Sequence, residues 1–416
     1  MNGLVKDSAK LLTANVVTQA VGLVAYPFLT RLFAPEDLGL LNLFTSIAAV
    51  IILLATAEYQ YAILLPKENR KATALTAFCG VILVVVTALV ALTVPFAKPI
   101  STLFSAPSLA SIYWMLPFFV LLSGLWNILN YSYLRNQQFT RISGYQISQS
   151  VFSASGKIGF GLMGKTAIGL PLATVLAQLA SVGLSVALAW KKLHASWEQI
   201  SWNDCRSAAK EYRNFPMFNL PRALVNSLGQ ALPVWILTPY FGLDNIGQLS
   251  LALMAAFVPL NIVARACYQV LFQRVAEAVQ QHRSINELLW RFMAWLTVTL
   301  VVGLAVVYIF VPQLVTVLFG SEWNETATII RRLYPYLILM PICGSICFLS
   351  DVFAKQKIAM WMETGYVAAV AVALIIGTHY NSFLSTVTAY AWVGCGYLFI
   401  QLLWFISLVR RYQKTL

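Results

Sequence analysis

Long apolar stretches alternate with short polar connections along nearly the whole chain. A helix needs about 20 apolar residues to cross the hydrocarbon core of a bilayer. Windows of that length predict spans at residues 10–31, 38–65, 74–96, 111–134, 144–164, 168–190, 215–240, 246–273, 289–312, 330–352, 358–378 and 384–408. The pattern therefore predicts an all-α polytopic membrane protein with twelve transmembrane helices.

A short motif at the connection between the first two predicted spans recurs 208 positions later, which is half of the 416-residue length. LTRLFAPEDLGLLNL at 29–43 is matched without a gap by LTPYFGLDNIGQLSL at 237–251, with the longest polar connection, 191–214, between them. The two halves therefore resemble a duplicated unit.

We expect an N-terminal lobe of six helices at 1–195, a cytoplasmic linker at 196–214 and a C-terminal lobe of six helices at 215–416. Because each lobe has an even number of spans, the two copies share one orientation in the membrane. They are then related by a parallel pseudo-two-fold repeat about the membrane normal.

Composition supports the membrane assignment. The chain is 59% hydrophobic and 10% charged, whereas soluble domains have about 25% charged residues. The net charge of +13 suggests nucleic acid as one partner, but basic cytoplasmic loops explain it more simply. Lys and Arg concentrate in the connections on one side, above all in 191–213, which predicts that both termini are cytoplasmic.

Polar side chains inside the predicted spans follow helical spacing, which places them on one face of each helix. Interhelical hydrogen bonding is one explanation, and the lining of a wet cavity is the other. The amides assigned to a cavity are Asn15, Gln19, Asn226, Gln230, Asn261 and Gln269.

Three basic residues follow the same helical spacing as these polar side chains: Lys157, Arg222 and Arg265. An unpaired cation at the bilayer centre costs roughly 2.5–3.5 kcal/mol on insertion scales. The spans hold fewer acids, Glu58 and Glu363. This surplus of positive charge predicts a cavity that receives an anion, although Lys157 and Arg222 lie near enough to span ends to reach an interface.

Glu58 and Arg265 occupy nearly equivalent places in the two halves. An ion pair between the lobes is one interpretation of this match. Ion coupling is the other, because a carboxyl group that leaves water favours its neutral form and can then carry a proton. Glu363 is assigned the same two alternatives.

The sequence has no pattern for catalysis, a metal or a cofactor. No Cys-x-x-Cys pair is present. The string GFGLMGKT at 159–166 fits GxxxxGK[ST], but it overlaps the end of the predicted span 144–164 and follows no strand, as a phosphate loop would. We therefore expect a protein that is not an enzyme and needs no cofactor.

Four stretches, 29–66, 215–252, 258–277 and 318–335, resemble the Wzx-type polysaccharide-unit flippases of the multidrug/oligosaccharidyl-lipid/polysaccharide (MOP) exporter superfamily. With the predicted spans, the likeness covers essentially the whole chain. It implies a MATE-like pair of six-helix lobes that alternates between inward-open and outward-open forms. Each motif is loose, but their order and spacing are specific.

The resemblance also implies the substrate and the partners. The substrate would be an oligosaccharide on undecaprenyl diphosphate, flipped across the bacterial inner membrane for a surface polysaccharide such as O-antigen. The family's cationic cavity would receive the diphosphate, and the candidates for that role, chosen by depth and spacing and not by a family motif, are Lys157, Arg222 and Arg265. Membrane lipids, a polysaccharide polymerase and a chain-length regulator are the expected partners, and nucleic acid is not.

Four rival functions remain, one of them a lipid II flippase, against which twelve predicted spans in place of fourteen argue. A drug/cation antiporter of the same superfamily would have an acid-dominated cavity, and here bases outnumber acids. A membrane polysaccharide polymerase would carry a large outer loop with catalytic Arg or His, whereas the longest predicted outer connection is 313–329. A structural scaffold of the polysaccharide machinery would need no buried charge.

Overall fold

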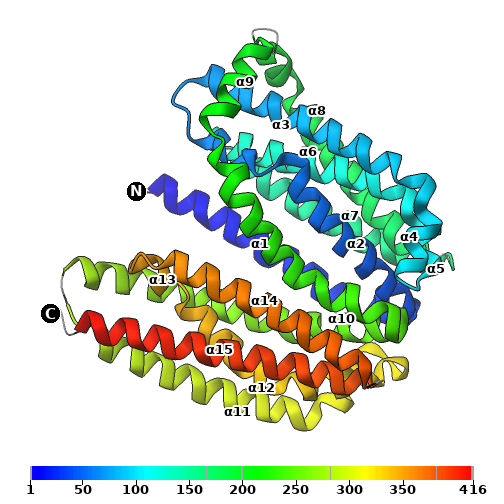
Figure 1. Ribbon diagram of the computed structural model, residues 1–416, viewed down its shortest axis with the longest axis vertical. Coiled ribbons are helices and arrows are strands. Elements are labelled where there is room, and N and C mark those ends of the chain that lie inside the picture. The colour runs from blue at the N-terminus through cyan, green and yellow to red at the C-terminus, as the bar shows by residue number, and fades with distance from the viewer. Residues whose placement is uncertain (1, 165–166, 198–199, 282, 381, 414–416) are drawn as a thin grey trace. The chain divides into compact units, whose positions relative to one another are not determined.

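A computed structural model describes residues 2–164, 167–197, 200–281, 283–380 and 382–413, and every regular element in these ranges is helical (Figure 1). The chain divides into two compact units, Met1–Asp244 and Asn245–Leu416. The boundary lies inside α10 (Leu220–Gln280), just after Gly242, whose φ of 80° interrupts the helix. The two units are taken one at a time below.

Unit 1 is built from long helices joined by short helical turns. α7 packs against both α1 and α8, while α6 packs against α2 and α3. Its elements are α1 (Asn2–Leu32), α2 (Pro35–Thr56), η1 (Tyr59–Leu64), α3 (Asn69–Leu92), η2 (Val94–Phe96), α4 (Ala97–Leu103), α5 (Pro107–Ile112), η3 (Tyr113–Met115), α6 (Leu116–Arg135), α7 (Phe139–Leu162), α8 (Gly169–Trp197), α9 (Trp202–Glu211), η4 (Phe215–Asn219) and the first part of α10.

Unit 2 contains the second part of α10 and four further long helices. α15 packs against α12 and α14, and α12 also packs against α11, so these helices lie side by side (Figure 1). Its elements are α11 (Asn286–Phe319), η5 (Ser321–Trp323), α12 (Asn324–Ile346), α13 (Leu349–Val352), α14 (Gln356–His379) and α15 (Phe383–Gln413).

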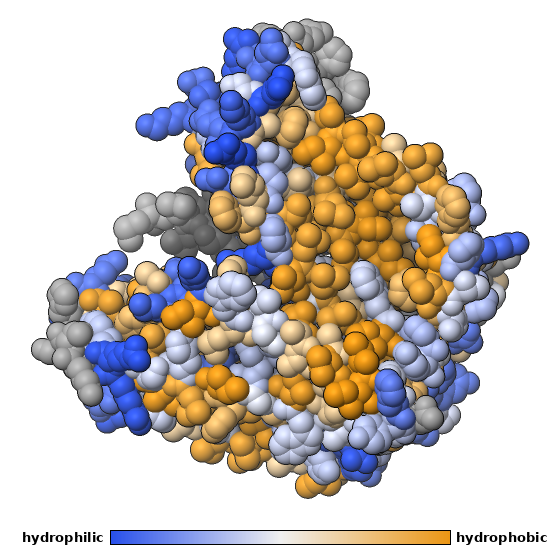
Figure 2. Space-filling view, viewed as in Figure 1, coloured by the Kyte–Doolittle hydropathy of each residue, from blue (hydrophilic) through white to orange (hydrophobic). Residues whose placement is uncertain are grey.

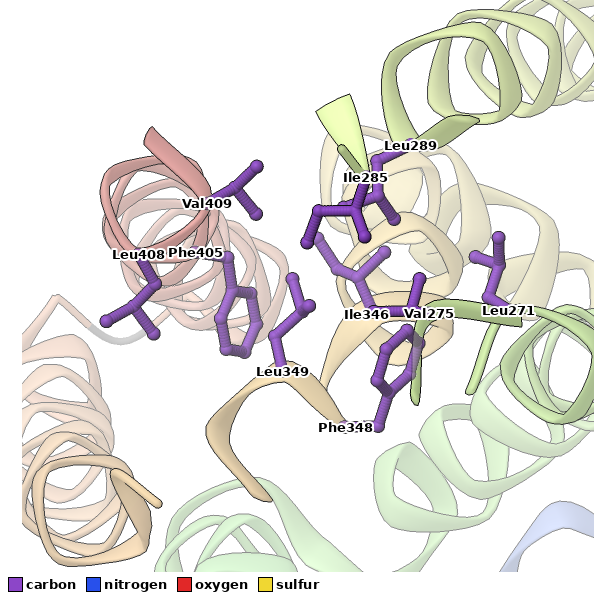
Figure 3. Close-up of a cluster of buried hydrophobic side chains, with 10 residues drawn as sticks. All are labelled: Leu271, Val275, Ile285, Leu289, Ile346, Phe348, Leu349, Phe405, Leu408 and Val409. Carbon is purple, nitrogen blue, oxygen red and sulfur yellow. The ribbon is translucent and has the colours of Figure 1, made fainter. Parts of the chain in front are cut away.

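One buried cluster joins the ends of the helices in unit 2 (Figure 3). Phe348, which is fully buried between α12 and α13, packs edge-on against Tyr268 and Phe272 of α10. The other members come from α10, α11, α12, α13 and α15: Leu271, Val275, Ile285, Leu289, Ile346, Leu349, Phe405, Leu408 and Val409. Aliphatic and aromatic contacts therefore hold this end of unit 2 together.

The repeated motif forms a similar local structure in each unit. Thr30 lies in the last turn of α1 and Thr238 lies just before the break at Gly242. Each hydroxyl donates to the carbonyl four residues earlier, of Tyr26 and Val234 respectively, and both side chains are buried. The motif thus marks a helix corner in both halves. The parallel two-fold relation of the lobes stays a prediction.

The helices make this a multi-pass membrane protein. Nine described segments are long and apolar enough to cross a bilayer. One of them, Phe215–Gln280, contains the break at Gly242. In unit 1 an apolar surface extends over α3, whereas polar residues gather around α9 (Figure 2). α7 is not among the nine, because Gln146, Gln149 and Lys157 lower its apolar content.

A buried glutamine links α10 to the start of α12, and its loss is expected to destabilise unit 2. The Gln248 amide nitrogen donates to the Glu322 carbonyl (2.8 Å), while its amide oxygen accepts from the Thr326 backbone N–H (3.0 Å) and hydroxyl (2.6 Å). Gln248→Leu leaves these groups unpaired, so the free energy of unfolding should fall by about 2–4 kcal/mol. Chemical unfolding in detergent measures this. An equal effect of Gln280→Leu, at an exposed position of the same helix, would contradict the prediction.

Candidate functional site

The three predicted cavity cations lie on two helices. Lys157 is on α7 and Arg222 is in the first turn of α10, both in unit 1, while Arg265 is on the part of α10 that belongs to unit 2. Among the described residues, none donates to or accepts from these three side chains, and none forms an ion pair with them. Arg222 and Arg265 are exposed and Lys157 is partly buried. Each can therefore accept an anionic partner.

Other basic residues are held by the protein itself. Arg135 donates to the carbonyls of Ile63 (3.1 Å) and Pro66 (2.7 Å), which ties α6 to the turn after α2. Arg331 donates to the Tyr308 carbonyl (3.2 Å) and lies over the Tyr308 ring. These contacts separate bases with a structural role from Lys157, Arg222 and Arg265.

The position of Lys157 is set by the close packing of α7. Gly161, one turn further along α7, lies so near Leu32 and Phe33 that a Cβ there would be 2.8 Å from the Phe33 ring. Gly156 lies next to Ala173 of α8. Small residues therefore bring α7 against the end of α1 and against α8. Lys157 lies near the α1–α2 corner as a result.

Several polar residues of α7 bind neighbouring helices, as interhelical hydrogen bonding requires. The Ser150 hydroxyl donates to the Thr18 carbonyl of α1 (3.2 Å), and the Ser148 hydroxyl donates to Ser181 of α8 (3.4 Å). The Gln146 amide oxygen is buried and has no hydrogen-bond partner among the described residues. Some polar side chains of α7 therefore hydrogen-bond to neighbouring helices, whereas the Gln146 amide oxygen has no described partner.

The predicted cavity amides differ in their surroundings. The Gln230 amide nitrogen donates to the Asn226 oxygen (3.0 Å) along α10, and both side chains are exposed. Asn15 and Gln269 are exposed, whereas Gln19 and Asn261 are partly buried. Asn15, Gln19, Asn226 and Gln230 belong to unit 1, and Asn261 and Gln269 to unit 2. Their role in a cavity stays a prediction.

Glu58 is a buried acid on an unusual turn. Its side chain is 3% exposed, and it follows α2 in a left-handed conformation (φ 62°), as does Ala57 before it (φ 46°). Two successive non-glycine residues of this kind cost about 1–3 kcal/mol each. No described Lys or Arg forms an ion pair with Glu58. Both interpretations of Glu58 stay predictions.

The sequence analysis missed the polar residues beside Glu58. Gln60 donates to the Glu58 carboxylate (3.4 Å), and the other amide atom of Gln60, Oε1, is buried and has no described partner. The Thr56 hydroxyl is buried and unpartnered in the same way. η1, which contains Gln60, contacts η4, the segment just before Arg222. Glu58 and Arg222 therefore lie toward the same end of unit 1.

The predicted linker contains a helix that packs on unit 1. α9 begins with Ser201, whose hydroxyl and backbone N–H both contact the Asp204 carboxylate as a capping box. Arg70 of α3 donates to Asp204 (2.9 Å), and Lys71 donates to Glu211 (3.2 Å). The Tyr59 hydroxyl donates to the Ala209 carbonyl (3.1 Å). The sequence analysis expected only a connection there.

Lowering the pH is expected to loosen α9. Hydrogen bonds from the Ser201 N–H and the Arg70 guanidinium hold the pKa of the Asp204 carboxyl below its ordinary value. Because the folded pKa is depressed, these contacts are fully present above the unfolded pKa of about 3.9. They are lost as the pH falls through the folded pKa.

Hydrogen exchange of the α9 amides, corrected for intrinsic rates, measures this loosening. Asp204→Asn should speed exchange a few-fold at neutral pH and shrink the acid step, while the Lys71–Glu211 contact remains. Asn203→Ala, at an exposed neighbouring position, serves as the control. An undiminished acid step in Asp204→Asn would refute the assignment.

Solved structures of membrane transporters resemble the whole chain. An inward-facing multidrug resistance MATE family transporter of the MOP superfamily has a TM-score of 0.72 at 14% identity, with 96% of each chain covered. The lipid II flippase MurJ in an inward closed conformation has a TM-score of 0.71 at 12% identity, with 98% of this chain and 91% of that chain covered. At these identities the likeness establishes the fold.

Two curated relatives come from polysaccharide synthesis. The succinoglycan biosynthesis transport protein ExoT of Rhizobium meliloti is 24% identical over 409 residues, 93% of this chain and 80% of its own. The teichuronic acid biosynthesis protein TuaB of Bacillus subtilis is 23% identical over 269 residues, 63% of this chain. That match spans about half (53%) of the length of TuaB.

The fold is that of solved multi-pass membrane transporters, among them a MATE family member of the MOP superfamily. Within this class, residues 28–328 match the family described as "Polysaccharide biosynthesis protein". The chain belongs to that family, the Wzx-like flippases of polysaccharide synthesis. The resemblance drawn from residues 29–66, 215–252, 258–277 and 318–335 is thereby confirmed.

Proposed function

We propose that this chain flips undecaprenyl-diphosphate-linked oligosaccharide units from the cytoplasmic to the periplasmic leaflet of the bacterial inner membrane by alternating access. The observation that carries the proposal is a set of three cations, in a member of a polysaccharide biosynthesis family, that no described residue pairs with: Lys157, Arg222 and Arg265. A relative and a structural neighbour support it: ExoT is a succinoglycan biosynthesis transport protein, and MurJ is a lipid II flippase.

The proposed topology has twelve spans. The break at Gly242 divides the longest of the nine candidate segments into two, and α1 and α7 supply two more. Both termini then lie on one side, which the charge bias makes the cytoplasmic side. Two six-helix lobes related by a parallel repeat would enclose the substrate path.

The chemistry suits this task. The lipid tail can stay in the bilayer while the polar head crosses through the protein. Lysine and arginine form charge-assisted hydrogen bonds to phosphate oxygens, and these are stronger than neutral ones. A diphosphate that binds Lys157, Arg222 and Arg265 would balance their charges. Asn15, Gln19, Asn226, Gln230, Asn261 and Gln269 would supply neutral hydrogen-bonding groups along the path.

Glu58 is the proposed coupling acid. It is buried beside Gln60 without a described cation, so it can exist as the neutral acid or exchange its proton for a cation. Glu363 is a second candidate, in unit 2. The product would pass to a polysaccharide polymerase and a chain-length regulator during synthesis of an O-antigen-like polymer.

Reconstitution tests the proposal. A strain that lacks this chain should accumulate its lipid-linked unit, which can be extracted and incorporated into liposomes with the purified protein. A membrane-impermeant glycan-oxidising reagent reaches only outer-leaflet lipid in protein-free vesicles. With the protein, nearly all of the lipid should become accessible. If inner-leaflet lipid stays protected while the inserted protein is folded, the proposed function is wrong.

A further inference from the structure

Four tyrosines from three helices form a cluster in unit 2 that none of the assignments above uses. Tyr336 lies on α12, Tyr366 on α14, and Tyr390 and Tyr397 on α15. The Tyr366 and Tyr397 rings stack with centroids 4.4 Å apart and an interplanar angle of 20°. The Tyr336 and Tyr390 rings meet at 63° with centroids 6.2 Å apart. The cluster therefore presents aromatic faces in two orientations.

The cluster carries polar groups as well as rings. The Gln401 amide nitrogen donates to the Tyr397 hydroxyl (3.3 Å). Each phenol can both donate and accept, so the four hydroxyls can bind a ligand that carries several hydroxyls.

The backbone is shaped to hold these rings. A Cβ at position 394 would lie 2.7 Å from the Tyr336 ring, so Gly394 allows that ring to lie directly on α15. Tyr390 and Tyr397 are seven residues apart and hence share one face of α15. Phe257 packs edge-on against Tyr336 at 5.6 Å. Residues of α10 and α15 therefore pack around the Tyr336 ring of α12.

The four tyrosines are not part of the closed core. None is among the buried residues of the unit, and each keeps a partly exposed side chain. Placing four phenol hydroxyls within a membrane protein costs free energy, because each polar group leaves water. Leucine or phenylalanine would fill the same space without that cost, so packing alone does not explain the tyrosines. Their partial exposure and their hydroxyl groups indicate a ligand surface.

We infer that Tyr336, Tyr366, Tyr390 and Tyr397 form a subsite for uncharged sugar residues of the transported lipid. A pyranose offers apolar C–H faces and a rim of hydroxyls, and tyrosine offers an apolar ring with one polar end. The described members of the cluster are phenols and the Gln401 amide, with no Lys or Arg to bind an acidic sugar. This inference rests on the proposed function and adds the class of sugar bound.

Binding to the full-length protein in nanodiscs tests the inference. The two probes are the lipid-linked unit extracted from a strain without this chain and undecaprenyl diphosphate without sugar. Tyr366→Phe keeps the stack on Tyr397 but removes one hydroxyl of the cluster. It should weaken binding of the glycosylated probe about tenfold and leave binding of the bare probe unchanged. Tyr366→Leu should weaken glycan binding further.

Tyr334→Phe is the matched control, since Tyr334 is on the same helix as Tyr336 but pairs with Tyr308 of α11 at 5.0 Å, outside the cluster. Equal binding of both probes by the wild type, or loss of both probes in Tyr366→Phe, would overturn the subsite. An unchanged affinity of Tyr366→Phe and Tyr366→Leu for the glycosylated probe would overturn it too. Failure of the wild type to bind either probe would instead refute the proposed function.

Discussion

Replacement of Lys157, Arg222 and Arg265 together by glutamine is expected to abolish export of the surface polysaccharide and to trap lipid-linked units on the cytoplasmic face. These side chains have no described hydrogen-bond or ion-pair partner, so their replacement breaks no described polar contact within the protein. What is lost is the attraction for the diphosphate. A hydrogen bond to a charged group contributes about 1.5–3 kcal/mol, so each single variant should reduce export roughly 10- to 150-fold.

Export is measured by complementation of a strain without this chain, at matched amounts of protein in the membrane. Arg274→Gln and Lys98→Gln are the controls, because these bases are exposed and lie outside the predicted spans. Normal export by the triple variant would show that the three charges only reach an interface. The site would then be wrong even though the family stands.

Glu58→Gln is expected to reduce export at least about tenfold, without loss of folded protein, because the neutral amide cannot release a proton. Glutamine has nearly the shape of glutamate and removes only the charge. The carboxyl is 3% exposed and is held on two left-handed residues, Ala57 and Glu58. A buried acid in a strained turn without a described counter-charge is more often functional than stabilising.

Export in inverted vesicles, with and without an imposed proton gradient, measures the role of Glu58. The gradient should stimulate the wild type and have no effect on Glu58→Gln. Glu68→Gln, an exposed acid just before α3, is the control for charge, and Ala57→Gly is the control for backbone strain. Ala57→Gly should keep export and raise the free energy of unfolding by about 0.4–1 kcal/mol. Gradient-stimulated export by Glu58→Gln would exclude the coupling role.

The helical segments could be predicted because each bilayer span needs a run of about 20 apolar residues, which the sequence shows directly. Every predicted span lies within a helix of the structure or largely overlaps one. α7 is the instructive case, since its polar stripe makes it too polar for a hydropathy criterion, while helical spacing of Gln146, Gln149 and Ser150 still predicts it. The helix α9 was missed, because its ten residues are polar and charged and carry no apolar stretch.

The residues of the candidate site could be predicted from the sequence only in part. Charge at membrane depth pointed to Lys157, Arg222, Arg265 and Glu58, because ions there need an explanation. Gln60 and Thr56 carry no such signal, since uncharged polar residues are common in membrane helices. The tyrosine cluster could not be predicted from the sequence for another reason. The four tyrosines come from α12, α14 and α15, and only packing brings their rings together.

The sequence by itself determined that this is a multi-pass helical membrane protein of the Wzx-like flippase family, because span length, charge bias and ordered motifs are properties of consecutive residues. The tertiary structure decided which polar groups are satisfied. It assigned Arg135 to backbone carbonyls and Gln248 to Thr326, and it gave Glu58 Gln60 as its hydrogen-bond donor. Partners of this kind depend on distances between helices far apart in the chain, which no linear pattern records.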